Sequence, residues 1–190
     1  MTDKIFQVKI TLVGSEPTIW RRMLIPSDLR LSVFHKVIQV AFGWTNSHLH
    51  QFIINNKFYT VKYPGDMDWS ELPNIDYKKE KTRVSDLISG EGESLTYEYD
   101  FGDSWNHDIL LEKILPVDTT AKFPVCLDGK RNGPPEDCGG VWGYTQLLEI
   151  LNNPEHEEYK SYMDWLGGKF DPDYFNIDRV NAILQRLRLF

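Results

Sequence analysis

The chain has 190 residues and a net charge of −7 at neutral pH, and 41% of its residues are hydrophobic while 26% are charged. This length and composition are typical of a globular protein with a substantial core, and the surplus of acids disfavours non-specific binding to nucleic acid. No apolar run approaches the roughly 20 residues of a membrane-spanning helix, and two cysteines are too few for a disulfide framework. We therefore expect a cytoplasmic protein without a membrane partner.

The first predicted elements form a β-hairpin. Residues 6–12 alternate between apolar and polar side chains, which is the period of a half-buried strand. Residues 14–17 (GSEP) supply a turn, and a second strand is predicted at 18–25.

A helix and further strands follow the hairpin. The apolar positions of residues 33–41 are spaced for one buried helix face, with Ser32 as the expected N-cap and Gly43 as the end. Strands are predicted at 48–54 and 58–61. This opening order of hairpin, helix and strand is similar to a β-grasp arrangement.

The middle of the chain contains an expected loop and a second hairpin. Residues 63–82 are polar and predict an exposed loop, and 84–88 fit a single helical turn. Strands at 94–101 and 105–115 flank a Gly102-Asp103 turn.

The overall prediction is an α+β fold in one domain that spans residues 1–190. A mixed, mostly antiparallel sheet would occupy the sheet-rich part, 4–115, and be covered by helices. Residues 116–141 are rich in Pro, Gly and charge and predict an irregular loop. Residues 142–189 show helical spacing of apolar side chains and predict a helical C-terminal region.

Residues 97–109 read YEYDFGDSWNHDI and contain the Asp-Phe-Gly triplet with which protein kinases hold magnesium. The glycine-rich loop and the HRD-type loop of kinases are missing, so we interpret the triplet as a hairpin turn. An even-length turn would pair Asp100 with Trp105 and Glu98 with His107. The second pair is either an ordinary cross-strand ion pair or a carboxylate that orients a functional histidine.

Two further histidines suggest a metal site. In a strand, His48 and His50 of SHLH project from the same face, as two ligands of one metal do. Many strands carry such pairs on a solvated face. With His107 and a carboxylate from Asp100 or Asp103, however, they would make a complete ligand set for zinc or another divalent cation.

A loop of acidic and glycine residues is the third candidate region. The segment 131–144 (RNGPPEDCGGVWGY) places Glu136 and Asp137 before two glycines and a helix that is expected to begin near Trp142. Asp137 either caps this helix, where the helix dipole favours a carboxylate, or takes part in catalysis.

The six tryptophans allow two interpretations. Core packing explains most of them, and a binding cleft lined by Trp44, Trp105 and Trp142 is the sharper alternative. Arg21 and Arg22 belong to residues 1–60, which carry seven basic and three acidic residues. These two arginines indicate either a solvated strand face or a small basic patch at the cleft for an anion or an acidic partner.

Five motifs in the same order, from about Phe6 to Leu184, closely resemble the plasmid pRiA4b ORF-3-like family: IWRRMLIP, FGWTNSHLHQF, YEYDFGDSWNHDI, GPPEDCGGVWGY and WLGGKFDPDYFN. The resemblance implies a link to plasmids and mobile elements but no particular reaction. The candidate residues that match its motifs are His48, His50, Asp100, Asp103, Trp105, His107, Glu136 and Asp137.

The leading functional hypothesis is a cytoplasmic binding or interaction module, linked to mobile elements, with a protein or a small ligand as its partner. Its site would be a polar cleft between the SHLH strand, the DFG hairpin and the PPED loop. The alternative, which we favour less, is a metal-dependent, hydrolase-like enzyme with catalytic candidates Asp100, Asp103, His107, Glu136 and Asp137. A nucleic-acid-associated protein that uses Arg21 and Arg22 is the third hypothesis.

Overall fold

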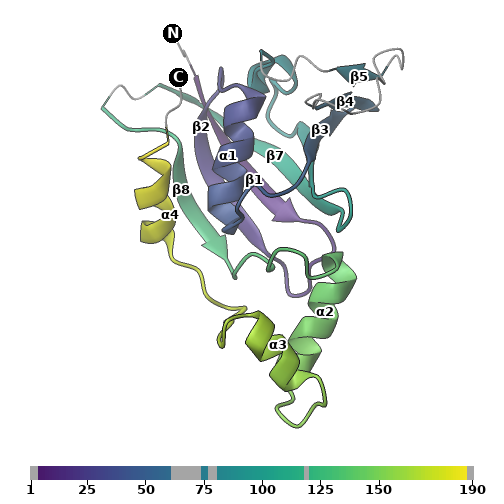
Figure 1. Cartoon of the computed structure of the whole chain (residues 1–190). Coiled ribbons are helices and arrows are strands. Elements are labelled where there is room, and N and C mark those ends of the chain that lie inside the picture. The colour runs from purple at the N-terminus through teal and green to yellow at the C-terminus, as the bar shows by residue number, and fades with distance from the viewer. Residues whose placement is uncertain (1–3, 61–73, 77–80, 118–119, 188–190) are drawn as a thin grey trace.

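The computed structural model describes residues 4–60, 74–76, 81–117 and 120–187. Within these residues, eight strands form a sheet of order β5-β4-β3-β6-β7-β1-β2-β8 (Figure 1). The strands are β1 (Lys4–Leu12), β2 (Trp20–Pro26), β3 (His50–Ile54), β4 (Lys57–Tyr59), β5 (Ile75–Asp76), β6 (Ser94–Tyr99), β7 (Trp105–Pro116) and β8 (Val125–Lys130). The helices are α1 (Leu31–Phe42), the 3₁₀ turn η1 (Val84–Asp86), α2 (Gly140–Leu151), α3 (Tyr159–Trp165) and α4 (Ile177–Leu184).

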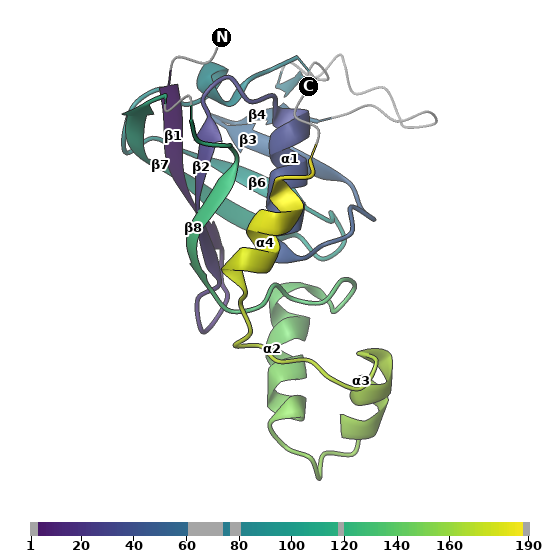
Figure 2. The ribbon, with the colours of Figure 1, turned by 90° about the vertical axis from the view of Figure 1, so that its left-hand side faces the viewer.

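The helices are distributed unevenly over the sheet. Figure 2 shows α1 and α4 against one face of the sheet, while α2 and α3 extend beyond its end. Every strand pair is antiparallel except β4–β5. The predicted α+β class with a mostly antiparallel sheet is therefore confirmed. None of the described helices is long and apolar enough to cross a membrane.

Strand β1 shows why the hairpin prediction succeeded. Phe6, Val8, Ile10 and Leu12 are buried beneath α1, and the residues between them are partly exposed. Alternation along a strand sends successive side chains to opposite faces, so an apolar period of two places one face in the core. The end of α1 also agrees with the prediction, because Gly43 is left-handed with φ 83°.

Three local features, a helix cap and two short strands, differ from the predictions. Helix α1 has Arg30, not Ser32, as its N-cap, and the N–H of Leu31 donates to the Thr82 carbonyl in place of a side-chain cap. The segment 116–141, predicted to be irregular, contains β8, which forms because the edge of β2 offers it a hydrogen-bonding partner. The predicted loop 63–82 lies mostly outside the described residues, but β5 falls within it.

The register of the β6–β7 hairpin corrects the prediction. Five residues, Asp100 to Ser104, separate the strands, so the turn has an odd length, and both of these end residues are left-handed with φ 56° and 53°. The predicted pairing of Glu98 with His107 is wrong: Glu98 pairs with Asn106, and His107 pairs with Tyr97. The predicted Asp100–Trp105 pair is wrong too, since Trp105 pairs with Tyr99. A slip of one residue reverses the face of each side chain relative to its partner strand.

Arg21 in β2 is buried, and its side chain contacts backbone carbonyl groups and two aromatic rings. Its guanidinium donates to the carbonyl groups of Trp20, Ala41, Lys130 and Arg131 at 2.7–2.8 Å. It also lies 4.9 Å from the ring centre of Phe42 and 4.3 Å from that of Phe175. Burial lowers the pKa of Arg21 to about 10, so the side chain stays positively charged at neutral pH.

We predict that Arg21→Met lowers the free energy of unfolding by about 3 kcal/mol or more, because buried carbonyl groups lose their donors. Arg22→Met is the matched control on the opposite face of β2. Arg22 is partly exposed and pairs with Glu112 at 2.7 Å, so its loss should cost about 1 kcal/mol or less. Urea denaturation of both variants measures the difference. Equal losses would contradict the structural role of Arg21.

Candidate functional site

His48 belongs to the loop between α1 and β3, and polar side chains hold this loop in place. The N–H of Asn46 donates to Oε1 of Gln39 at 2.8 Å, and Oδ1 of Asn46 lies 2.6 Å from Nε2 of His35. The N–H of Ser47 donates to the hydroxyl of Tyr99 at 3.0 Å. These contacts fix the backbone on both sides of Asn46, which is left-handed with φ 60°.

Asp100 begins the turn between β6 and β7 and is almost fully buried. Its N–H donates to the Leu49 carbonyl at 2.8 Å, which ties the turn to the His48 loop. Its Oδ1 accepts from the N–H of Gly102 at 2.9 Å. This local hydrogen bond leaves Oδ2 as the atom that faces His48.

Two glycines let the loop with Glu136 and Asp137 dock closely. A Cβ at Gly133 would lie 1.9 Å from the carbonyl oxygen of Phe42 at the end of α1. A Cβ at Gly140, which has φ 69°, would lie 2.4 Å from the carbonyl oxygen of Asp103. Only glycine permits these approaches, so the loop is wedged between α1 and the hairpin turn.

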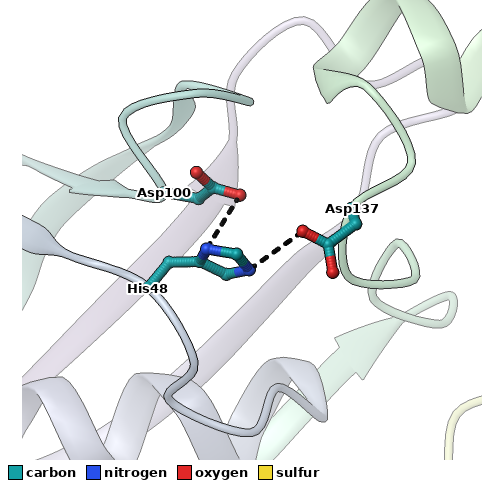
Figure 3. A group of neighbouring side chains, drawn as sticks. All are labelled: His48, Asp100 and Asp137. Carbon is teal, nitrogen blue, oxygen red and sulfur yellow. Dashed lines mark ion pairs between the residues drawn. The ribbon is translucent and has the colours of Figure 1, made fainter.

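The three segments bring four polar side chains together, of which Figure 3 shows His48, Asp100 and Asp137. Nδ1 of His48 lies 3.6 Å from Oδ2 of Asp100. Nε2 of His48 lies 3.1 Å from Oδ1 of Asp137 and 3.7 Å from Oε2 of Glu136. We call these four residues the His48 cluster. Asp137 is the most exposed of them, with 69% of its side chain accessible.

Glu136 is oriented by hydrogen bonds behind the cluster. Its Oε1 accepts from the N–H of Thr45 at 2.8 Å, from the Thr45 hydroxyl at 3.0 Å and from the Tyr99 hydroxyl at 3.1 Å. Burial raises the pKa of Tyr99 to about 12, so this phenol keeps its proton and remains a donor at neutral pH. The other carboxylate oxygen, Oε2, lies 3.2 Å from the Tyr99 hydroxyl and 3.7 Å from Nε2 of His48.

The cluster has the chemistry of a cation site. A neutral imidazole carries one N–H and cannot donate from both nitrogens to the surrounding carboxylates. Nε2 of His48 is inaccessible to solvent and has no partner with hydrogen-bond geometry among the described residues, despite its 3.1 Å contact with Asp137. Ligand atoms at about 2.0–2.2 Å from a tetrahedral metal lie roughly 3.3–3.6 Å apart, close to the spacings seen here. Potential ligand atoms of His48, Asp100 and Asp137 all lie within 4.8 Å of one another.

The three predicted histidine ligands do not gather in one place. His50 is buried and stacks on His35 with ring centres 3.4 Å apart. His107 is fully buried, and its Nδ1 lies 3.1 Å from the Trp105 carbonyl. Among the described residues, neither histidine belongs to the group of potential metal ligands around His48. His107 shares a face of β7 with Trp105, Ile109 and Leu111, which are all buried, so its side chain points into the core.

The five proposed cleft residues do not line one common cleft, although Arg21 and Trp44 border the same cavity. Trp44 and Trp105 are buried with ring centres 6.1 Å apart, whereas 73% of Trp142 is exposed. Arg21 and Arg22 point to opposite faces of β2, so they do not form one basic patch. Asp103 accepts a hydrogen bond from the N–H of Gly139 at 3.1 Å and thus supports the loop.

The helix-capping interpretation of Asp137 is wrong. Gly139 is the N-cap of α2, and no side chain caps this helix. Sequence reasoning did not identify Thr45, Asn46 and Tyr99 as supports of the site. Only Tyr99 had a usable signal, because it alternates with Tyr97 along β6 and therefore shares its buried face.

Comparison with known proteins gives concordant matches. The sequence profile described as "Plasmid pRiA4b ORF-3-like protein" matches residues 4–179. A protein of Sinorhizobium fredii named "Uncharacterized protein y4hQ" is 35% identical over 188 residues, which cover 98% of this chain and 94% of that protein. The crystal structure of a "Protein of Unknown Function MM3350" from Methanosarcina mazei Go1 is similar with a TM-score of 0.83 and 36% identity, over 94% of this chain and 98% of that chain.

The burial of His107 predicts a pH dependence of stability. Burial lowers the pKa of His107 from 6.5 to about 3, so below pH 6.5 only the unfolded chain takes up this proton. The contribution of neutral His107 to the free energy of unfolding is therefore complete above pH 6.5. It is lost as the pH falls towards 3, by up to about 1.4 kcal/mol per pH unit.

We expect His107→Phe to remove this contribution. The measurement is the free energy of unfolding in urea between about pH 7 and pH 5, in which the wild type should lose stability more steeply than the variant. Because other groups titrate equally in both proteins, the difference between the two slopes isolates His107. Parallel slopes would show that the buried imidazole does not control acid stability.

Proposed function

Because the chain belongs to the plasmid pRiA4b ORF-3-like family, and its two relatives above carry no activity in their names, we propose a function from the site itself. The protein is a binding module whose His48 cluster takes up a divalent cation. The observation that carries this proposal is Nε2 of His48, a buried nitrogen without a hydrogen-bond partner among the described residues that faces the carboxylates of Glu136 and Asp137.

The four residues of the His48 cluster would have different roles in cation binding. Nε2 of His48 and an oxygen of Asp137 would ligate the cation, and Oε2 of Glu136, 3.7 Å from Nε2, would approach it as a further donor. Asp100 would accept a hydrogen bond from the Nδ1–H group and orient the ring, as carboxylates commonly do behind metal-bound histidines. One imidazole with carboxylate oxygens suits zinc, and manganese is accepted by the same donor types.

The surroundings support binding of a further partner at the cation. A hollow of about 500 Å³ adjoins His48 and Asp100. Leu49 and Phe101 line it and are 41% and 45% exposed, so apolar side chains are available for contact. A small ligand or a protein side chain that enters this hollow would reach the cation.

The hypothesis of a metal-dependent enzyme retains one supporting observation. The hollow beside the cluster leaves space for a water or a substrate, as catalytic zinc sites do. A hydrolase-like activity therefore stays a prediction, as do the mobile-element link and the cytoplasmic location. A nucleic-acid role through Arg21 and Arg22 has little support, since one is buried and the other pairs with Glu112.

We predict that tag-free protein binds zinc with a stoichiometry of one. At about one hundred times its Kd, the cation should stabilise the fold by about 2.7 kcal/mol, which raises the Tm by roughly 5–10 °C for a chain of this size. Calorimetric titration and thermal unfolding measure both effects. His48→Ala and Asp137→Asn should each weaken binding by about tenfold or more.

The controls use the same residue types elsewhere in the chain. His156→Ala changes a histidine that precedes α3, and Asp108→Asn changes an exposed aspartate of β7. Because neither residue belongs to the His48 cluster, both variants should bind zinc as the wild type does. Manganese is titrated in parallel to rank the two cations. Absence of binding by either cation, or equal weakening in the control variants, would refute the proposed site.

A further inference from the structure

A second cavity lies on the helical side of the sheet, away from the hollow at His48. Its volume is about 710 Å³, within the range of roughly 300–1,000 Å³ that is typical of small-molecule sites. The end of α1, the segment 169–176 and α4 form its walls. We call it the α1–α4 cavity.

The charge of this cavity is opposite to that of the whole protein. Arg21, Lys169 and Arg179 line it, whereas Asp171 is the one acidic residue among its described lining. Oδ1 of Asp171 already accepts from the N–H of Asp173. A chain of net charge −7 therefore presents a local surplus of positive charge here.

None of these three cations has a carboxylate partner in the described part of the chain. The hydrogen bonds of Arg21 all go to backbone carbonyl groups and use four of its five N–H donors. Lys169 and Arg179 are exposed and form no ion pair with a described residue. A buried guanidinium without an anion, next to two unpaired cations, favours an anionic occupant.

The remaining walls are aromatic. Phe42, Trp44, Phe170, Tyr174 and Phe175 line the cavity. Phe42 and Phe175 already lie against the guanidinium of Arg21 on the cavity wall. Flat, apolar surfaces of this kind bind rings by stacking and by burial of apolar area.

From this combination we propose that the α1–α4 cavity binds a small organic anion that carries an aromatic ring system. The rings lie among the aromatic side chains, and the anionic group faces Lys169 and Arg179. This site is distinct from the His48 cluster and requires no metal. A neighbouring groove shares Phe42, Trp44 and Phe170 with the cavity and is also lined by Glu136 and Asp137.

Anilinonaphthalene sulfonate is a suitable probe, because it joins an aromatic body to one negative charge and fluoresces when it leaves water. The titration is done on the full chain with a chelator present, which separates it from the cation site. We expect saturable binding of one probe per chain. The double variant Lys169→Glu/Arg179→Glu should weaken it by about ten- to a hundredfold, the range for lost charge-assisted contacts.

The matched control is Lys36→Glu/Lys160→Glu, which makes the same change in net charge at exposed residues outside the cavity and should alter the Kd less than twofold. A second measurement needs no variant: uncharged phenylnaphthylamine should bind the wild type at least about tenfold more weakly than the sulfonate. The proposal is overturned if the probe does not saturate at one per chain, if the control pair weakens binding equally, or if the uncharged probe binds equally well.

Discussion

The guanidinium of Arg21 donates to carbonyl groups from three parts of the chain: β2 itself, the end of α1, and the end of β8 with the residue that follows it. The segment before α4 also closes over it through the ring of Phe175. A lysine could not satisfy this set, because its ammonium lacks the planar fork of five donors. The position of α1 over the sheet, and the point at which the chain leaves β8, both depend on this one buried cation.

The candidate site is built on that arrangement. The chain leaves β8 at Arg131 and runs directly into the loop that carries Glu136 and Asp137. Its course is then set by contact, since Gly133 touches the end of α1 and Gly140 touches the hairpin turn. Two acidic residues that are adjacent in sequence are thus held against His48, which lies in the loop after α1. The stability of the core and the geometry of the His48 cluster are consequently coupled through the same backbone segments.

The interior next to the His48 cluster contains a network of buried polar side chains. His35 contacts Tyr97 at 2.7 Å and Asn46 at 2.6 Å, and Gln39 contacts the same tyrosine and the Asn46 backbone. Burying such groups costs free energy unless each finds a partner, so a network of this kind usually serves to hold something in a defined position. Here it holds the loop of His48, while Tyr99 continues the network to Glu136.

The sequence by itself determined the elements whose information is local: the alternation of β1, the apolar face of α1 and the order of the hairpins. It could not determine the β6–β7 register, because that depends on a five-residue turn with Asp100 and Ser104 in the left-handed region. That register decides that His107 faces Tyr97, whereas alternation along β7 places it in the core on the same face as Trp105 and Ile109. Nor could it show that Arg21 is buried or that β8 exists, since both follow from partners distant in sequence. Periodicity reports which face a side chain takes within its own element, whereas close approach between elements decides what that face meets.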